Sequence, residues 1–162
     1  MMGLSLTKES YYKDNTALVK IVNPLSSDLN VMRNTMLFGG LETLAYNINR
    51  KQADLKFFEF GKTYQKNDES ETAFKYSETK HLTLYAIGRK YAENPYSENN
   101  KVDFAFIKSC VESILNKLSV TYKISESSDE QFTYGLSYVH KKNILVNFGL
   151  VDKAICNKMD VN

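Results

Sequence analysis

Residues 55–65 read LKFFEFGKTYQ, the stretch of this 162-residue chain that most clearly predicts its fold. Phenylalanine and tyrosine favour strands, and apolar residues fall on both faces near the middle of the stretch, which is typical of a central strand. The polar segment 67–77 follows, and then a second apolar run, HLTLYAIG, at residues 81–88. Two such runs joined by a polar segment predict an antiparallel hairpin.

A helix is predicted before this hairpin, from about residue 35 to residue 50. Asn34 or Thr35 can cap it, because a short side-chain oxygen accepts a hydrogen bond from a free N–H group of the first turn. Apolar residues then recur at helical spacing, at Leu37, Leu41, Leu44 and Ile48. The pair Gly39-Gly40 costs about 1–2 kcal/mol in helix propensity relative to alanine. We expect close packing of a neighbouring element, in this chain or in a partner, to offset that cost.

The remaining elements extend the pattern on both sides. A lead-in segment, residues 1–17, precedes a short strand that ends at Asn23-Pro24, because proline cannot donate to a sheet ladder. A helix with apolar residues on one face follows a polar loop and is capped by Asp103. Further predicted strands are 120–124, 134–140 and 144–150, and a last helix begins after Asp152. Grouped, largely antiparallel strands with a few helices indicate an α+β fold.

Composition excludes several classes of protein. The chain has 21 Lys and Arg against 19 Asp and Glu, a net charge of +2 that does not by itself indicate nucleic-acid binding. No apolar run approaches the roughly 18 residues of a membrane span, and the N-terminus is not a secretion signal. Cys110, Cys156, His81 and His140 stand at unrelated spacings and do not indicate a metal site. We expect Cys110 to be a buried thiol, both histidines to be half-buried on strands, and a reducing cytoplasm as the compartment.

The phosphate-binding and hydrolase motifs GxGxxG, GxSxG and HExxH are absent from the sequence. A more specific signal comes from four segments that follow one another in a fixed order. The segments are VKIVNPLSS (19–27), MRNTML (32–37), GLETLAYN (40–47) and FFEFGKTY (57–64). In this order they resemble the β subunit of phenylalanyl-tRNA synthetases, in the part that is similar to a class II synthetase catalytic domain. The resemblance extends over about residues 4–160.

The resemblance implies both a fold and an assembly. The fold is a class II aminoacyl-tRNA synthetase-like antiparallel β-sheet flanked by helices, in one catalytic-like domain, 1–162, of a longer multidomain β subunit. In that family the domain is a catalytically silent copy of the α-subunit domain and packs against the α subunit in an (αβ)2 enzyme. The holoenzyme uses ATP and Mg²⁺ to join phenylalanine to its tRNA. The implied partners are therefore the α subunit and, through the holoenzyme, tRNA; no cofactor is implied in this chain itself, and no membrane.

Two positions bear on the implied lack of catalytic activity. A working class II site has Arg-x-Glu shortly after a strand like FFEFGKTY, and the arginine holds the α-phosphate by charge-assisted hydrogen bonds. Gln65 and Asn67 stand at the corresponding positions here, and neither is charged. Lys62 and Lys66 are flexible point charges and do not replace a bidentate guanidinium. We therefore predict no catalytic residue in this chain.

The candidate interface residues lie around the first helix: Arg33, Met36, Phe38 and Gly40. Met32, Met36 and Phe38 flank the core stripe, so the helix would be apolar nearly all round, and we expect an exposed apolar patch that a partner covers. Arg33 either anchors a carboxylate, of the partner or of its own sheet, or is a surface residue near the cap. Glu59 lies among aromatic residues and is predicted to form a structural ion pair.

Two alternatives remain beside the silent domain. One is an active ATP-dependent ligase domain, against which Gln65 and Asn67 argue. The other is a stand-alone tRNA-binding module, against which the small net charge argues. Five basic residues could contact tRNA phosphates, but Asp54 and Glu59 lie between them and favour a solvated face. The five are Arg50, Lys51, Lys56, Lys62 and Lys66.

Overall fold

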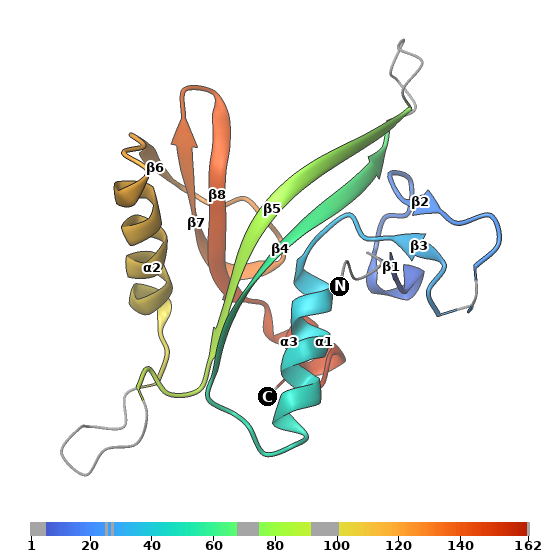
Figure 1. Cartoon of the computed structure of the whole chain (residues 1–162), viewed down its shortest axis with the longest axis horizontal. Helices are drawn as coiled ribbons and strands as arrows, with labels where there is room; N and C mark the ends of the chain where they lie inside the picture. The colour runs from blue at the N-terminus through green and yellow to red at the C-terminus, as the bar shows by residue number, and fades with distance from the viewer. Residues whose placement is uncertain (1–5, 25, 27, 68–74, 92–100, 162) are drawn as a thin grey trace. The chain divides into compact units, whose positions relative to one another are not determined.

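The computed structural model describes residues 6–24, 26, 28–67, 75–91 and 101–161 (Figure 1). The chain divides into two compact units. The first comprises Met1–Thr43 and Phe57–Tyr85, and the second Leu44–Lys56 and Ala86–Asn162. The elements combine short antiparallel sheets with three α-helices in the described residues, so the α+β class is confirmed.

The first unit begins with a small antiparallel sheet of three two-residue strands. Its order is β1 (Leu6–Thr7), β3 (Val31–Met32) and β2 (Val19–Lys20), and Met32 lies opposite both Leu6 and Val19. A single 3-10 turn, η1 (Glu9–Tyr11), follows β1. The strand predicted to end at Asn23-Pro24 is therefore present as β2, and it ends earlier, at Lys20.

The long hairpin consists of β4 (Leu55–Lys66) and β5 (Tyr76–Ile87), so β5 begins earlier than the predicted residue 81. Figure 1 shows the two strands running in opposite directions. They form a two-stranded sheet in the described part of the chain, and the prediction that 55–65 is a central strand is wrong. The apolar second face explains the error, because Phe58 and Phe60 are 64% and 75% exposed instead of covered.

Helix α1 (Leu37–Ile48) matches the predicted helix closely. The Thr35 hydroxyl accepts a hydrogen bond from the Leu37 N–H at 3.3 Å, which confirms one of the two proposed caps. Leu41 and Leu44, from the predicted apolar stripe, are buried. The chain leaves the helix through Lys51, which has a φ of 64°.

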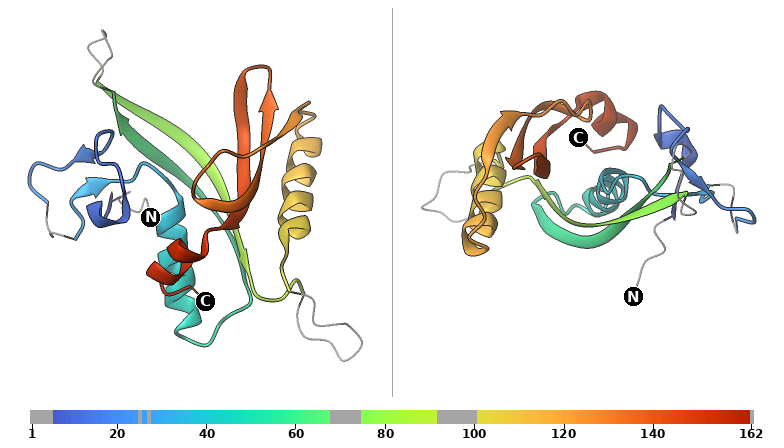
Figure 2. Two further views of the ribbon diagram at one scale, coloured as in Figure 1. Left: turned by 180° about the vertical axis from the view of Figure 1, so that it is seen from behind. Right: turned by 90° about the horizontal axis from the view of Figure 1, so that it is seen from above.

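In the second unit, α2 (Phe104–Lys117) lies along a sheet of order β6-β7-β8 (Figure 2). The strands are β6 (Lys123–Glu126), β7 (Phe132–His140) and β8 (Asn143–Val151), all antiparallel. The Tyr138 hydroxyl, at the centre of this core, donates to Glu112 of α2 at 2.8 Å. β6 begins three residues later than predicted. Leu118 lies beyond the last helical turn of α2 and is exposed.

Both predicted aspartate caps of the second unit are confirmed. The Asp103 carboxylate accepts from the Phe106 N–H at 2.9 Å at the start of α2. The Asp152 carboxylate accepts from the Ala154 N–H at 2.8 Å at the start of α3 (Lys153–Lys158). None of the helices that the structure describes is long and apolar enough to span a membrane.

Candidate functional site

Arg33 lies between β3 and α1 and binds β4 through its guanidinium. Its Nε donates to the Lys62 carbonyl at 2.9 Å, and its Nη1 donates to Glu59 Oε1 at 2.7 Å. The arginine side chain is 13% exposed and the glutamate side chain 36%. The structural ion pair predicted for Glu59 is therefore confirmed, and the carboxylate that Arg33 anchors belongs to β4 of the same chain, in a different sheet from β3.

Gly61 makes this arrangement possible, and the sequence analysis did not single it out. A Cβ atom at Gly61 would overlap Nη2 of Arg33 and the end of Met36, whose Sδ would lie 2.9 Å away. A glycine inside a strand is a signal of such close approach. The Arg33 carbonyl also accepts from the Tyr64 N–H at 2.9 Å. The segment that precedes α1 is therefore joined to β4 by a backbone hydrogen bond as well as by side chains.

Gly40 faces the ring of Tyr85 on β5. A Cβ atom at Gly40 would overlap this ring, with Cδ1 2.7 Å away and other ring atoms closer. The Tyr85 hydroxyl donates to the Met36 carbonyl at 2.7 Å, and burial raises the pKa of Tyr85. The close packing predicted for the glycine pair is confirmed at Gly40. At Gly39 the nearest atom would lie 3.8 Å from a Cβ, an ordinary contact, so that glycine has no such role.

Met36 and Phe38 do not form the exposed apolar patch that was expected. They are 4% and 7% exposed. The Phe38 ring contacts the rings of Tyr11 and Tyr12, each at a centroid distance of 5.2 Å. The lead-in segment covers this side of the helix, which helical periodicity alone cannot show. The prediction of an exposed patch is wrong, while an interface role for Arg33, Met36, Phe38 and Gly40 stays a prediction.

Gln65 and Asn67 lie at the far end of β4, and both are exposed. The Asn67 N–H donates to the Lys75 carbonyl at 2.8 Å and continues the pairing of the hairpin. Lys62 is paired with Glu78 at 2.6 Å, and this carboxylate raises the pKa of Lys62.

The residues of this hairpin do not fit ATP and Mg²⁺. Neither β4 nor β5 contains an arginine that could hold a phosphate in a bidentate manner. Among the described residues, no group of three or more His, Cys, Asp or Glu could hold a metal ion.

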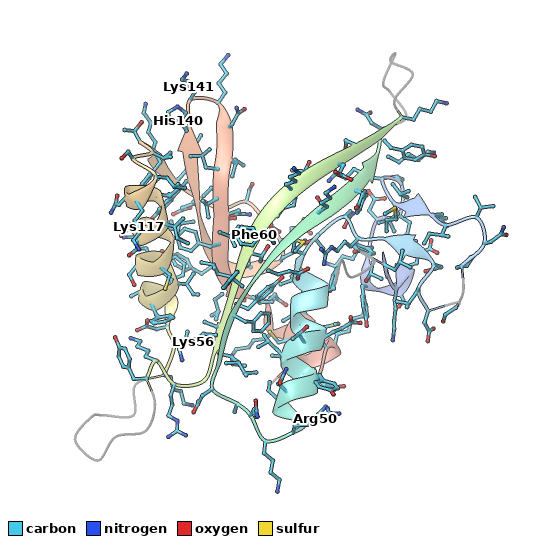
Figure 3. The ribbon with its side chains drawn as sticks, viewed as in Figure 1. Arg50, Lys56, Phe60, Lys117, His140 and Lys141 are labelled. Atoms are coloured by element: carbon cyan, nitrogen blue, oxygen red, sulfur yellow. The ribbon has the colours of Figure 1, made fainter. Side chains whose placement is uncertain are left out.

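The remaining candidate residues have structural partners. His81 on β5 is half-buried, with its Nε2 2.8 Å from the Thr63 hydroxyl; burial, and next the charge of Arg33, lower its pKa. His140, at the end of β7 (Figure 3), donates through Nδ1 to the Thr121 carbonyl at 2.7 Å. The predictions for both histidines are confirmed. Cys110 is half-buried, so the prediction of a buried thiol is wrong.

The sequence matches, over residues 1–162, the family described as "Phenylalanyl tRNA synthetase beta chain CLM domain". The chain belongs to this family. It is 40% identical to the phenylalanine–tRNA ligase β subunit of Bacteroides thetaiotaomicron and 30% identical to that of Porphyromonas gingivalis. These matches cover 100% and 99% of the chain and 21% of each relative. The chain thus spans about a fifth of the length of the curated relatives that it matches.

A solved structure shows the same fold. It is titled "Structure of Desulfitobacterium hafniense PylSc, a pyrrolysyl tRNA synthetase" and superimposes with a TM-score of 0.64 at 14% identity. The match covers 98% of this chain and 54% of the other chain. The predicted synthetase-like fold and the predicted family are both confirmed.

Proposed function

We propose that this chain is a catalytically silent, class II-like domain of a phenylalanine–tRNA ligase β subunit. Its role is to provide a scaffold that packs against the α subunit, in an (αβ)2 enzyme that attaches phenylalanine to tRNA. The observation that carries this proposal is the pair Gln65 and Asn67 at the end of β4, where the resemblance requires Arg-x-Glu. ATP and Mg²⁺ then act elsewhere in the holoenzyme.

Charge at the hairpin supports this assignment. Holding an α-phosphate requires a planar, pre-organised guanidinium, and Lys62 is a point charge already engaged by Glu78. Arg33 does not substitute for it, because its Nε and Nη1 are bound to the Lys62 carbonyl and to Glu59. Arg33, which binds the hairpin from outside it, therefore stabilises the fold and does not hold a phosphate.

The contacts of Arg33, Gly61, Gly40 and Tyr85 support the scaffold role. They fasten the start of α1 to β4 and β5 through one ion pair, two close glycine contacts and the hydrogen bond from Tyr85 to the Met36 carbonyl. Side chains held by several partners lose little further freedom when a second protein binds. Such a domain keeps its sheet for shape after the reactive groups are gone.

Calorimetric titration of the 162-residue chain with ATP and Mg²⁺ tests the silence. We expect no binding isotherm. A dissociation constant below about 100 μM, roughly −5.5 kcal/mol, would favour the active ligase domain instead. Co-purification of the full-length β subunit with its α subunit tests the scaffold role in a separate measurement.

A further inference from the structure

The end of the second unit at which β7 turns into β8 carries unbalanced positive charge. Residues 116–124 and 139–146 include four lysines and one histidine but no aspartate or glutamate. The lysines are Lys117, Lys123, Lys141 and Lys142, and all four are exposed. Because the net charge of the whole chain is only +2, the rest of the chain is net negative without them. The excess of positive charge is therefore a property of this end and not of the protein as a whole.

The strand register places a lysine beside an aliphatic side chain at this end. Lys123 of β6 lies opposite Val139 of β7, and Val139 lies opposite Ile144 of β8. Residues that lie opposite each other in antiparallel strands point to the same face of the sheet. Lys123, Val139 and Ile144 therefore form a row across one face, next to the turn that holds Lys141 and Lys142.

The end of α2 is fastened to the same place. The Val120 N–H donates to the Leu115 carbonyl at 3.1 Å, so the chain turns immediately after the helix. The Thr121 carbonyl then accepts from Nδ1 of His140 at 2.7 Å. Figure 3 labels Lys117 on α2 and His140 at the end of β7. The contacts thus join the segment after Lys117 to the β7–β8 turn.

Exposed aliphatic side chains lie among these lysines, and the lysines have no acidic partners. Leu118, directly after Lys117, is 66% exposed, and Ile144 is 64% exposed. Among the described residues, none of the four lysines takes part in an ion pair. We define the basic end by six residues. They are Lys117, Leu118, Lys123, Lys141, Lys142 and Ile144.

The side-chain types at the basic end do not suit phosphate or base recognition. It has no arginine, the residue whose planar guanidinium binds phosphate in a bidentate manner. It also has no exposed aromatic ring to stack with a base or to lie in a membrane interface. The ring of Tyr122, in the same segment, is stacked on Tyr138 with the centroids 4.4 Å apart.

The same side chains suit an acidic polypeptide. Aliphatic side chains gain free energy when a partner brings apolar groups against them, and charged residues around a small apolar centre are typical of protein interfaces. We propose that the basic end binds an acidic segment of a protein. Its carboxylates pair with the lysines, and its aliphatic side chains pack against Leu118 and Ile144.

Two properties follow from this chemistry. Exposed charge pairs are screened by salt, so the affinity falls as the ionic strength rises. Removal of the aliphatic side chains from the acidic segment weakens binding at every salt concentration, because apolar burial is lost. The inference does not rest on the proposed function, since it involves neither ATP nor assembly with the α subunit.

The experiment titrates the 162-residue chain into a fluorescein-labelled peptide of Leu-Glu-Glu repeats and follows fluorescence anisotropy. We expect binding that weakens as salt is added. A peptide of Ser-Glu-Glu repeats keeps the charge and lacks the leucines, and it should bind about ten-fold more weakly. A peptide of Leu-Lys-Lys repeats should not bind, because its charge has the wrong sign.

A pair of charge variants assigns the binding to this surface. Lys123→Gln with Lys141→Gln should weaken binding of the Leu-Glu-Glu peptide about five-fold, because two carboxylate contacts are lost. Lys80→Gln with Lys153→Gln is the matched control. It changes the net charge equally, at exposed lysines that do not belong to the basic end, and should leave the affinity close to that of the parent. Circular dichroism verifies that each variant is folded.

Three results would overturn the proposal. The first is equal affinity of the two double variants for the Leu-Glu-Glu peptide, and the second is equal affinity of the parent for the Leu-Glu-Glu and Ser-Glu-Glu peptides. The third is tighter binding of single-stranded oligouridylate, or of phosphatidylserine vesicles, that is lost in the Lys123 and Lys141 variant. That result would assign the basic end to RNA or to a membrane. None of these results affects the calorimetric and co-purification tests of the proposed function.

Discussion

Arg33 is the residue around which the first unit is organised. Its side chain is largely buried, and its guanidinium donates hydrogen bonds to one carboxylate and one carbonyl of β4. A buried donor or acceptor that loses its partner costs about 1–3 kcal/mol. The partial exposure of Glu59 reduces the Coulomb part of that cost, because water screens the pair.

We therefore expect Arg33→Met to lower the free energy of unfolding by about 1–3 kcal/mol. The methionine preserves much of the volume and removes the hydrogen bonds to Glu59 and to the Lys62 carbonyl. Urea denaturation monitored by circular dichroism measures the change. Lys20→Met is the control, because the Lys20 side chain is 63% exposed and its ion pair with Glu9 should contribute little. Equal stabilities of parent and Arg33→Met would refute the structural role.

His81 predicts a pH dependence. Burial, and then Arg33, lower its pKa in the folded state, so the unfolded chain binds this proton more tightly. The contribution of His81 to stability is present above its ordinary pKa and is lost as the pH falls below that value. We expect the urea midpoint to fall between pH 7.5 and pH 5.5, and to fall less in His81→Gln. An identical decrease in both proteins would assign the effect to other groups.

At the scale of the element, helix α1 contains a matched pair of glycines with opposite roles. Gly40→Ala should destabilise the domain by about 1–3 kcal/mol, because its Cβ would overlap the Tyr85 ring. Gly39→Ala should stabilise it by up to about 1 kcal/mol, because alanine has the higher helix propensity and the added atom meets only an ordinary contact. Thermal unfolding of both variants measures the two changes in stability. A stabilising effect of Gly40→Ala would contradict the close contact between Gly40 and the Tyr85 ring.

The hairpin shows a different kind of local requirement. Gly61 interrupts an aromatic strand where Arg33 and Met36 cross it. At the other end, Gly88 has a φ of 81°, and a Cβ there would overlap the Ala53 carbonyl and Asp54. Only glycine satisfies both the backbone conformation and the space at Gly88. Glycines at these two positions thus allow neighbouring segments of the chain to pack closely against the hairpin.

At the scale of the whole molecule, the proposed lack of catalysis predicts that substitutions at the C-terminal end of β4 leave enzyme activity unchanged. Gln65→Ala with Asn67→Ala in the full-length β subunit should leave the kcat of tRNA aminoacylation by the assembled enzyme unchanged, because neither side chain holds ATP in the proposed scheme. Aminoacylation of tRNA with labelled phenylalanine measures this. A ten-fold loss of kcat with intact assembly, about 1.4 kcal/mol of transition-state stabilisation, would place these residues in the reaction.

A test of assembly requires substitutions at exposed residues of α1. Because Met36 and Phe38 are buried, glutamate at these positions would disturb the fold before it could report on a partner. Exposed residues of α1, such as Glu42 and Tyr46, are suitable substitutes for co-purification experiments.

The sequence by itself determined the elements and the family. Periodicity at Leu37, Leu41 and Leu44 located α1, the aspartates located the starts of α2 and α3, and the ordered segments led to the synthetase family, because these signals are local along the chain. The ion pair of Glu59 also followed locally, since a charge among aromatic residues requires a partner.

Only the tertiary structure decided which faces are covered. It buried Phe38 under Tyr11 and Tyr12, left Phe58 and Phe60 exposed, and turned Asp54 and Glu59 toward arginines. The covered ring of Phe38 and the two ion pairs depend on contacts between residues some 25 or more positions apart, as between Arg33 and Glu59. Local patterns state that a side chain is apolar or charged, but the partner that covers or neutralises it is selected by the path of the chain in space.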